Sequence, residues 1–310
     1  MSRYAVIDFG SNTIRLCVYS VDIQRDEPLT RKNITMLLNY KEMAGISSYI
    51  QDGTLQPKGI KKAARIIREQ QECASFFDCD QVQVFATAVL RNCKNSKSAK
   101  RAIEKACGLP ITLLSNEEEA HLGVVGARLD CALANATVVD IGGGSTELTA
   151  LSRGSEKAAT SIPQGSLSSF SQFVKGVLPT SGEMKQIARS FDDLYAQEDQ
   201  KAFVRKNLIG IGGAIRAAAK VYGDVFNGGK RSNILLPEQL EEMLAAYRKD
   251  PADLMHRAIK TIPDRIHTFI PGCSIILQVF EHSGARKLTI AKHGVREGFL
   301  IERVLGKITS

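Results

Sequence analysis

The sequence contains no tryptophan, only seven cysteines and no long apolar run, and each of these features excludes a class of protein. An odd number of cysteines without a Cys-x-x-Cys pair argues against a disulfide framework and favours a reduced, cytoplasmic protein. No apolar stretch approaches the roughly 20 residues that cross a bilayer, and Met1–Tyr4 lacks the basic start of a signal peptide. We therefore expect no membrane partner.

Several sequence motifs of common catalytic and binding sites are also missing. The chain has neither the Gly-x-x-x-x-Gly-Lys-[Ser/Thr] of a P-loop nor a Gly-x-Gly-x-x-Gly. Its five histidines show no zinc-ligand spacing, and no Cys/His pair indicates a thiol nucleophile. Aromatic residues are scattered and make up 6%, which argues against base stacking, so we expect no nucleic-acid partner.

The remaining composition is that of a globular protein with a mild excess of positive charge. The 310 residues are 44% hydrophobic and 24% charged, and this length predicts two domains. Lys and Arg number 41 against 33 Asp and Glu, for a net charge of +8. Such a charge fits an anionic partner, but it also fits a well-solvated surface, and composition leaves both open.

One internal repeat organises the chain. Residues 6–16 recur 132 positions later as residues 138–148, and both copies read as strand, Asp-x-Gly turn with small polar residues, and strand. A single turn of this kind arises for local reasons, because Asp and Gly favour turns. Two copies, one in each expected domain, predict a duplicated phosphate-binding architecture.

Strand-like and helical segments alternate around this repeat, which predicts an α/β fold. Strands are expected at 4–9, 14–21, 34–38, 82–86, 111–114, 137–141, 147–151, 208–211 and 288–291. Helices are expected at 57–77, 98–107, 116–129, 164–174, 181–196, 214–222, 237–248, 253–260, 274–282 and 297–305. Capping boxes, Ser115 with Glu118 and Thr180 with Glu183, predict where two of these helices begin.

Both repeated turns carry groups suited to phosphate. The missing Cβ atoms of Gly10 in the first turn, and of Gly142, Gly143 and Gly144 in the second, let backbone N–H groups approach an anion closely. Hydroxyl donors are added by Ser11, Thr13, Ser145 and Thr146.

Two aspartates stand at the strand ends beside these turns. Asp8 and Asp140 are placed to hold Mg²⁺ directly or through water, because Mg²⁺ takes one or two carboxylates together with phosphate oxygens. The alternative is that each aspartate only caps its turn. Glu147 follows the second turn, in a segment expected to be a strand, where glutamate is unfavourable. A carboxylate at this place beside a phosphate-binding turn indicates metal binding or water positioning.

Three further features have both a functional and a structural interpretation. Gly212 and Gly213 lie between a strand and a helix, where they suit either phosphate binding or close helix–strand packing. Arg91 ends a strand and suits bidentate phosphate contact, although a lone arginine is usually a surface residue. Glu119 lies in the first turn of a helix, and there local sequence favours interaction with the helix dipole.

Taken together, the motifs resemble those of the exopolyphosphatase/guanosine pentaphosphate phosphohydrolase family, in its short two-domain form. The matching segments are collinear across nearly the whole chain. They are Asp8-x-Gly10-Ser11-Asn12-Thr13, Ala86-Thr87 with Arg91, Glu117-Glu118-Glu119-Ala120, Asp140 through Glu147, Gly210-x-Gly212-Gly213, Pro271-Gly272 and Arg296-Glu297-Gly298.

The resemblance implies a fold of two ribonuclease H-like domains, as in actin-like ATPases and acetate and sugar kinases, with a cleft between them. The domains would span residues 1–124 and 125–310, with the final helix at 296–310 packing back on the first.

The resemblance also implies roles for individual residues. Glu119 would be the catalytic base, and Arg91 would bind phosphate. Asp140 and Glu147, helped by Asp8, would hold Mg²⁺. The phosphate would be cradled at Gly10, Ser11, Asn12, Thr13, Gly142, Gly143, Gly144, Ser145, Gly212 and Gly213.

The implied activity is Mg²⁺-dependent hydrolysis of the terminal phosphoanhydride of inorganic polyphosphate. Cleavage of guanosine pentaphosphate at the same site, and a non-catalytic role as a polyphosphate- or guanosine-phosphate-binding regulator, are the alternatives. His267 and Lys292-His293 depart from the family pattern, which leaves the substrate preference open. A homodimer is also left open.

Overall fold

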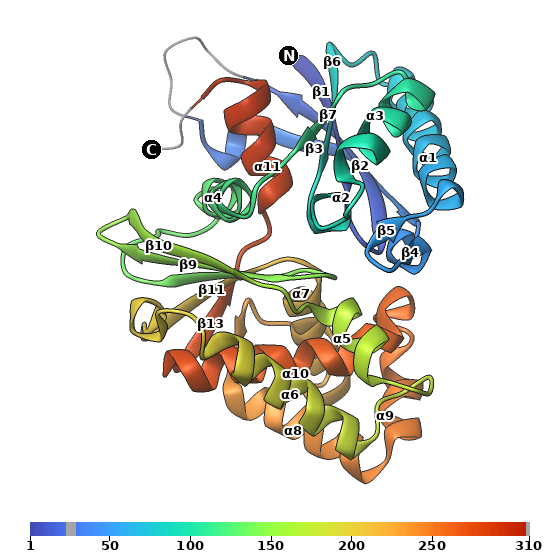
Figure 1. The fold of residues 1–310 in the computed structure, drawn as a ribbon. Coiled ribbons are helices and arrows are strands. Elements are labelled where there is room, and N and C mark those ends of the chain that lie inside the picture. The colour runs from blue at the N-terminus through green and yellow to red at the C-terminus, as the bar shows by residue number, and fades with distance from the viewer. Residues whose placement is uncertain (23–28, 308–310) are drawn as a thin grey trace. The chain divides into compact units, whose positions relative to one another are not determined.

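The computed structural model describes residues 1–22 and 29–307, and contacts between residues divide the chain into two compact units (Figure 1). Unit 1 contains Met1–Asp130 and the returning segment that begins at Val295, and unit 2 is Cys131–Gly294. The division thus follows Asp130 rather than residue 124. Within the described residues, no helix combines the length and hydrophobicity needed to cross a membrane.

Unit 1 is built on a five-stranded sheet in the order β3-β2-β1-β6-β7. The first three strands pair antiparallel, whereas β6 and β7 run parallel to β1. The bounds are β1 Ser2–Phe9, β2 Thr13–Val21, β3 Ile34–Met43, β6 Gln81–Ala86 and β7 Ile111–Leu113, and a separate small hairpin joins β4 Ile50–Gln51 to β5 Thr54–Leu55.

Helices cover both faces of this sheet. Alternate residues of β1 point to opposite faces, so Ile7 packs with α1 and α3 while Val6 packs with α4 and α11. The bounds are α1 Pro57–Ser75, α2 Ala88–Arg91, α3 Ser96–Cys107, α4 Asn116–Ala127 and α11 Val295–Phe299, with short 3₁₀ turns at Arg31–Asn33 and Ile46–Tyr49 and a π-helical turn at Leu300–Val304.

Unit 2 repeats the same strand arrangement and adds one strand. Its sheet has the order β10-β9-β8-β11-β13-β12, in which β10, β9 and β8 pair antiparallel and β11 and β13 run parallel to β8. The bounds are β8 Thr137–Ile141, β9 Thr146–Ser152, β10 Ser155–Ile162, β11 Asn207–Ile211, β12 Ile234–Leu235 and β13 Lys287–Ile290. The sequence repeat therefore corresponds to two equivalent hairpins, β1–β2 and β8–β9.

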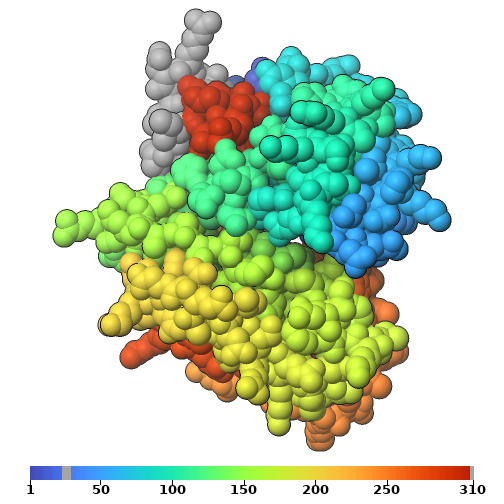
Figure 2. Space-filling model, viewed as in Figure 1, coloured from blue at the N-terminus to red at the C-terminus, as the bar shows by residue number. Residues whose placement is uncertain are grey.

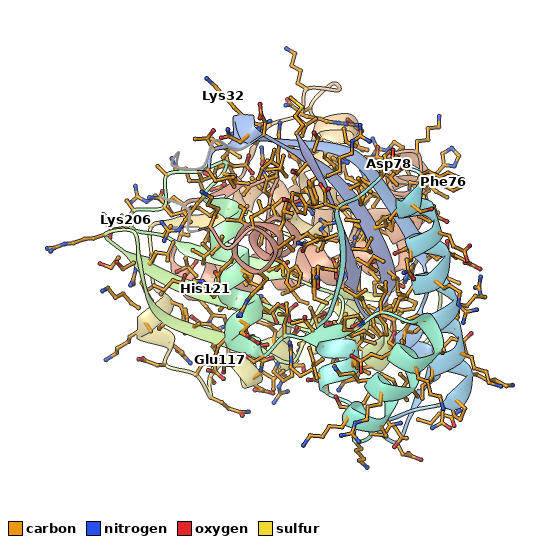
Figure 3. The ribbon with its side chains drawn as sticks, turned by 90° about the horizontal axis from the view of Figure 1, so that it is seen from above. Lys32, Phe76, Asp78, Glu117, His121 and Lys206 are labelled. Carbon is orange, nitrogen blue, oxygen red and sulfur yellow. The ribbon has the colours of Figure 1, made fainter. Side chains whose placement is uncertain are left out.

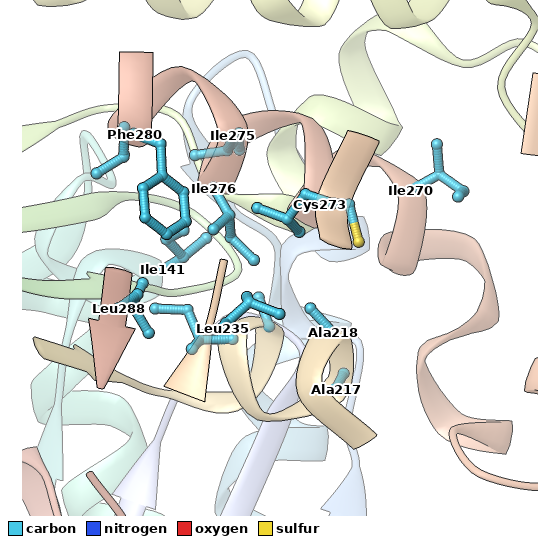
Figure 4. Packing of buried hydrophobic residues seen from close by; sticks show 14 of the residues in the cluster. Ile141, Ala217, Ala218, Leu235, Ile270, Cys273, Ile275, Ile276, Phe280 and Leu288 are labelled. Carbon is cyan, nitrogen blue, oxygen red and sulfur yellow. The ribbon is translucent and has the colours of Figure 1, made fainter. Parts of the chain in front are cut away.

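The core of unit 2 forms around the buried helix α10. Figure 4 shows Ile276 and Phe280 of this helix beside Ile141 and Leu288 of the sheet. The helices are α5 Ser166–Phe173, α6 Ser181–Tyr195, α7 Gly213–Val221, α8 Pro237–Lys249, α9 Pro251–Ala258 and α10 Ile266–Ser283, with 3₁₀ turns at Gln200–Phe203 and Pro263–Arg265 and a π-helical turn at Tyr222–Phe226.

The structure differs from the expected elements at α10, at β10 and at Arg91, which ends the short helix α2 and not a strand. Helix α10 begins at Ile266 rather than at 274 and contains Pro271, because burial of its apolar side outweighs the one backbone hydrogen bond that proline removes. Strand β10 is observed but was not expected. Few residues of its sequence, Ser-Glu-Lys-Ala-Ala-Thr-Ser-Ile, have a high strand propensity. Pairing with β9 stabilises it instead.

Gly298 allows α11 to pack directly on α4. A Cβ atom at this position would collide with the carbonyl oxygen of Leu122. We expect Gly298→Ala to lower the free energy of unfolding by about 1–3 kcal/mol, because the two helices would have to move apart. Chemical denaturation measures this change. The matched control is Gly182→Ala in α6, where a Cβ has room, and equal stability of the two variants would contradict the prediction.

Candidate active site

The two repeated turns have the same local geometry. The Gly10 N–H donates to the carbonyl of Thr13 at 3.0 Å, and the Gly142 N–H donates to the carbonyl of Ser145 at 2.9 Å. A Cβ at either glycine would lie 3.3 or 3.2 Å from that carbonyl oxygen, which is tighter than a normal contact. The same close approach therefore favours glycine at both positions.

The N–H groups at the tips of the turns are available to a ligand. Among the described residues, no acceptor is found for the backbone N–H groups of Ser11 and Asn12, or for those of Gly143 and Gly144. These residues are partly exposed, so water reaches them. Consecutive unpaired N–H groups form the kind of concave site that binds phosphate.

Helix α5 orients the second turn. The N–H of Ser166 donates to the Gly142 carbonyl at 3.0 Å, and those of Leu167 and Ser168 donate to the Gly143 carbonyl at 2.9 and 2.8 Å. In a planar trans peptide the N–H points opposite to the carbonyl. Because both carbonyls point toward α5, the N–H groups of Gly143 and Gly144 point away from it, toward the open side of the turn.

Two carboxylates face each other beside this turn. Asp140 on β8 and Glu147 on β9 are direct partners in the antiparallel register, so their side chains share one face of the sheet. Glu147 is only 3% exposed and accepts a 2.9 Å hydrogen bond from the Ser161 hydroxyl. Gly212, with φ +85°, approaches so closely that a Cβ there would collide with the Asp140 carboxylate.

This carboxylate pair suits a divalent cation. Like charges placed directly opposite each other on paired strands are destabilising, and a cation between them removes that penalty. Within the part of the chain that the structure describes, no three His, Cys, Asp or Glu side chains form a metal-binding group. Mg²⁺ needs only one or two protein carboxylates, because phosphate oxygens and water complete its shell, so Asp140 and Glu147 fit it.

Asp8, the equivalent of Asp140 in unit 1, has different neighbours. It lies opposite Arg15 in the strand register and 3.9 Å from the guanidinium of Arg296. Burial raises the pKa of Asp8, while Arg296 and Arg15 act in the opposite direction. Its cationic neighbours make Asp8 a weaker candidate for metal binding than the acids of unit 2.

Arg91 and Glu119 are joined in unit 1. Arg91 Nη1 donates to Glu119 Oε2 at 2.8 Å and to the Leu114 carbonyl at 3.0 Å. Both side chains are largely buried, with 13% and 12% exposed. Helix α4 begins with the Ser115–Glu118 capping box, in which the Glu118 N–H donates to Ser115 Oγ at 3.1 Å. This cap fixes the start of the helix and therefore the place of Glu119 in its first turn.

The guanidinium of Arg91 has unused donors. Its Nε and Nη2 atoms are buried and have no hydrogen-bond acceptor among the described residues. Buried donors are rarely left unpaired, and a phosphate oxygen is the acceptor that a planar guanidinium suits best. Glu119 therefore binds one nitrogen of the guanidinium, and the other two nitrogens keep donors without an acceptor in the described part of the chain.

The third glycine cluster lies where strand β11 meets helix α7. A Cβ at Gly210 would collide with Leu288 and Ile215, so this glycine serves close packing. Gly213 begins α7, and a Cβ there would collide with the guanidinium of Arg265, so close packing applies to this glycine as well. Phosphate binding at Gly212 and Gly213 stays a prediction. The sequence gives no signal for Arg265, because no motif separates it from the surface arginines.

Each unit thus brings together part of the predicted set. Unit 1 unites Arg91 with Glu119, and it holds Asp8 with the first turn. Unit 2 unites Asp140, Glu147, the second turn and Gly212.

The sequence matches a known family over most of its length. A profile of the Ppx/GppA phosphatase family matches residues 30–307. The guanosine-5'-triphosphate,3'-diphosphate pyrophosphatases of Aeromonas hydrophila subsp. hydrophila and Aeromonas salmonicida are 26% and 24% identical over 309 and 318 residues. Each alignment covers 98% of this chain and 59% of the relative, so the chain spans about three fifths of these relatives' length.

Solved structures share the fold. An Aquifex aeolicus member of the Ppx/GppA family has a TM-score of 0.78 at 22% identity, with 98% of each chain covered. An exopolyphosphatase from Cytophaga hutchinsonii has a TM-score of 0.82 at 19% identity, with 100% of each chain covered. This likeness confirms the expected pair of ribonuclease H-like domains of the actin-like ATPase type. The profile match confirms the resemblance predicted from the motifs, and the chain belongs to the Ppx/GppA phosphatase family.

Proposed function

We propose that this chain hydrolyses the terminal phosphoanhydride of inorganic polyphosphate and releases orthophosphate. The observation that carries the proposal is the glycine turn of unit 2, whose unpaired N–H groups lie beside the facing carboxylates of Asp140 and Glu147. Unpaired N–H groups suit phosphate oxygens, and a carboxylate pair suits the cation that accompanies them.

The chain supplies the groups that such a reaction needs. Phosphoryl transfer to water depends on an oriented nucleophile and on neutralised phosphate oxygens more than on covalent chemistry. Glu119 would orient the attacking water and accept its proton, while the free Nε and Nη2 donors of Arg91 would bind a phosphate oxygen. Mg²⁺ held by Asp140 and Glu147 would neutralise the charge of the terminal phosphate.

Guanosine pentaphosphate is the second candidate substrate. The two Aeromonas relatives are named as guanosine-5'-triphosphate,3'-diphosphate pyrophosphatases, and the terminal phosphoanhydride of such a nucleotide requires the same groups. A non-catalytic regulator is the third candidate. The presence of Arg91, Glu119, Asp140 and Glu147 argues against it, because binding alone does not require a general base.

A direct assay separates the three candidates. Purified protein is incubated with Mg²⁺ and either long-chain polyphosphate or guanosine pentaphosphate, and released orthophosphate is measured over a range of substrate concentrations. A higher kcat/KM for polyphosphate supports the proposal, and a higher value for the nucleotide supports the second candidate. Binding of either ligand without phosphate release would overturn both.

A further inference from the structure

We infer that helices α1 and α3 of unit 1 form a binding surface for the remote part of a long polyphosphate chain. This inference rests on the proposed function, because it assigns a second contact area to the same substrate. The surface, called here the basic face, consists of Lys58, Lys61, Arg65 and Arg68 on α1, Lys97, Arg101 and Lys105 on α3, and Lys94 just before α3.

Helical spacing places these cations on the outside of unit 1. On α1 they follow one another at intervals of three, four and three residues, and on α3 at intervals of four, so each set forms a stripe along one side of its helix. The opposite sides are buried, through Ala63 and Ile67 on α1 and Ala99 and Ile103 on α3. Figure 3 shows side chains of α1 extending away from the sheet.

The two stripes belong to one continuous surface. Both helices pack on the same face of the sheet of unit 1. The guanidinium of Arg68 on α1 donates to the carbonyl of Ala106 on α3 at 2.5 Å, so the helices are in direct contact. Figure 2 shows α3, in turquoise, at the surface of unit 1. At 1.5 Å per residue, each stripe is roughly 12–15 Å long.

Nearly all of the chain's excess charge lies on this surface. Residues 57–75 and 94–107 contain ten lysines and arginines and three glutamates, for a net charge of +7 compared with +8 for the whole chain. Glu69 pairs with Arg65, and Glu104 pairs with Lys100. Among the residues that the structure describes, the other cations of the basic face form no ion pair with an acid. A concentrated charge of this kind attracts polyanions.

The chemistry of the basic face favours a polyanion that has no bases and no lipid tail. Single-stranded nucleic acids bind where aromatic side chains alternate with cations, and membranes bind helices with exposed apolar side chains. The large hydrophobic side chains that are exposed in the described residues include none on α1 or α3, and Phe76 lies just beyond the end of α1. Polyphosphate needs only cations along its length.

The test compares two variants with the same loss of charge. The face variant combines Lys58→Gln, Lys61→Gln, Lys97→Gln and Arg101→Gln, all at exposed positions that form no ion pair with a described acidic residue. The control variant combines Lys185→Gln, Lys201→Gln, Lys249→Gln and Lys260→Gln, which are exposed positions of unit 2. Affinities for long-chain polyphosphate, tripolyphosphate and a homopolymeric RNA are measured at several salt concentrations, with thermal unfolding as the check on folding.

We expect the face variant to lose about 10–100-fold in affinity for long-chain polyphosphate, and much less for tripolyphosphate. The slope of log K against log salt concentration should become shallower by about three. Each lost phosphate contact reduces the magnitude of this slope by about 0.7–0.9. The control variant should bind like the wild type. Unchanged affinity and slope in the face variant, or a loss confined to RNA, would overturn the inference.

The same measurements keep the inference separate from the proposed function. If the wild type binds long-chain polyphosphate through the basic face but releases no orthophosphate, the surface stands and the hydrolase proposal fails. If the wild type releases orthophosphate and the face variant binds as tightly as the wild type, the hydrolase proposal stands and the surface fails.

Discussion

Glu119→Gln is expected to lower the rate of the proposed phosphate release by about 10²–10⁴-fold while leaving substrate affinity close to that of the wild type. Glutamine has the size of glutamate, and its amide oxygen can still accept the hydrogen bond from Arg91 Nη1 that the carboxylate accepts at 2.8 Å. It cannot accept a proton from water, and loss of a general base has an effect of this size. Phosphate release at saturating substrate measures the loss.

The control for this variant lies in the same helical turn. Glu117 is exposed at the start of α4 (Figure 3), and its carboxylate accepts a 2.8 Å hydrogen bond from the Ser115 hydroxyl. Glu117→Gln removes the same charge from the same helix N-terminus, so it reproduces any effect on the helix dipole. We expect its turnover to stay within about twofold of the wild type. Similar losses in the two variants would show that Glu119 acts through the helix and not on water.

The repeat and the caps were predictable because they depend on neighbouring residues. The Asp-x-Gly turns close through a hydrogen bond between residues three apart, Gly10 to Thr13 and Gly142 to Ser145, so four consecutive residues specify each turn. The Thr180–Glu183 capping box is equally local, and the structure contains it with the Glu183 N–H donating to Thr180 Oγ1 at 3.3 Å. Turns and caps of this kind can therefore be recognised from a few consecutive residues.

The arrangement around these turns was not predictable, because it depends on contacts between distant parts of the chain. The unpaired donors of Arg91 arise because Leu114 and Glu119, more than twenty residues away, accept from its Nη1, and no described residue accepts from its Nε or Nη2. The position of Arg265 against Gly213 depends on how α10 packs on α7. No local pattern encodes either contact.

The returning C-terminal segment is a further example. The Arg296-Glu297-Gly298 motif could be quoted from the sequence, but its role depends on strands near the N-terminus. Tyr19 donates to Glu297 Oε1 at 2.6 Å inside the protein, and the Arg296 guanidinium lies 3.9 Å from Asp8. Burial opposes the charge of Arg296, but the surrounding Cys17, Glu297 and Asp8 outweigh it and raise the pKa of the arginine. The segment therefore contacts both strands that flank the first turn, within unit 1.

Asp140→Asn and Glu147→Gln are each expected to lower phosphate release by about 10²–10³-fold at moderate Mg²⁺. Each substitution removes one of the two facing carboxylates that would hold the cation against the terminal phosphate. Glutamine at position 147 can still accept the hydrogen bond from Ser161, which limits the change to charge. A titration with Mg²⁺ measures the requirement for metal, and Asp193→Asn, at an exposed position of α6, is the matched control.

Stability without metal provides an independent check on this assignment. Two carboxylates facing each other repel, so neutralising one of them should leave the metal-free variant as stable as the wild type or slightly more stable. Added Mg²⁺ should then raise the unfolding temperature of the wild type but not that of either variant, because a ligand stabilises only the state that binds it. Full activity of the wild type in excess EDTA would refute the metal assignment. Equal stabilisation of wild type and variants by Mg²⁺ would place the cation elsewhere.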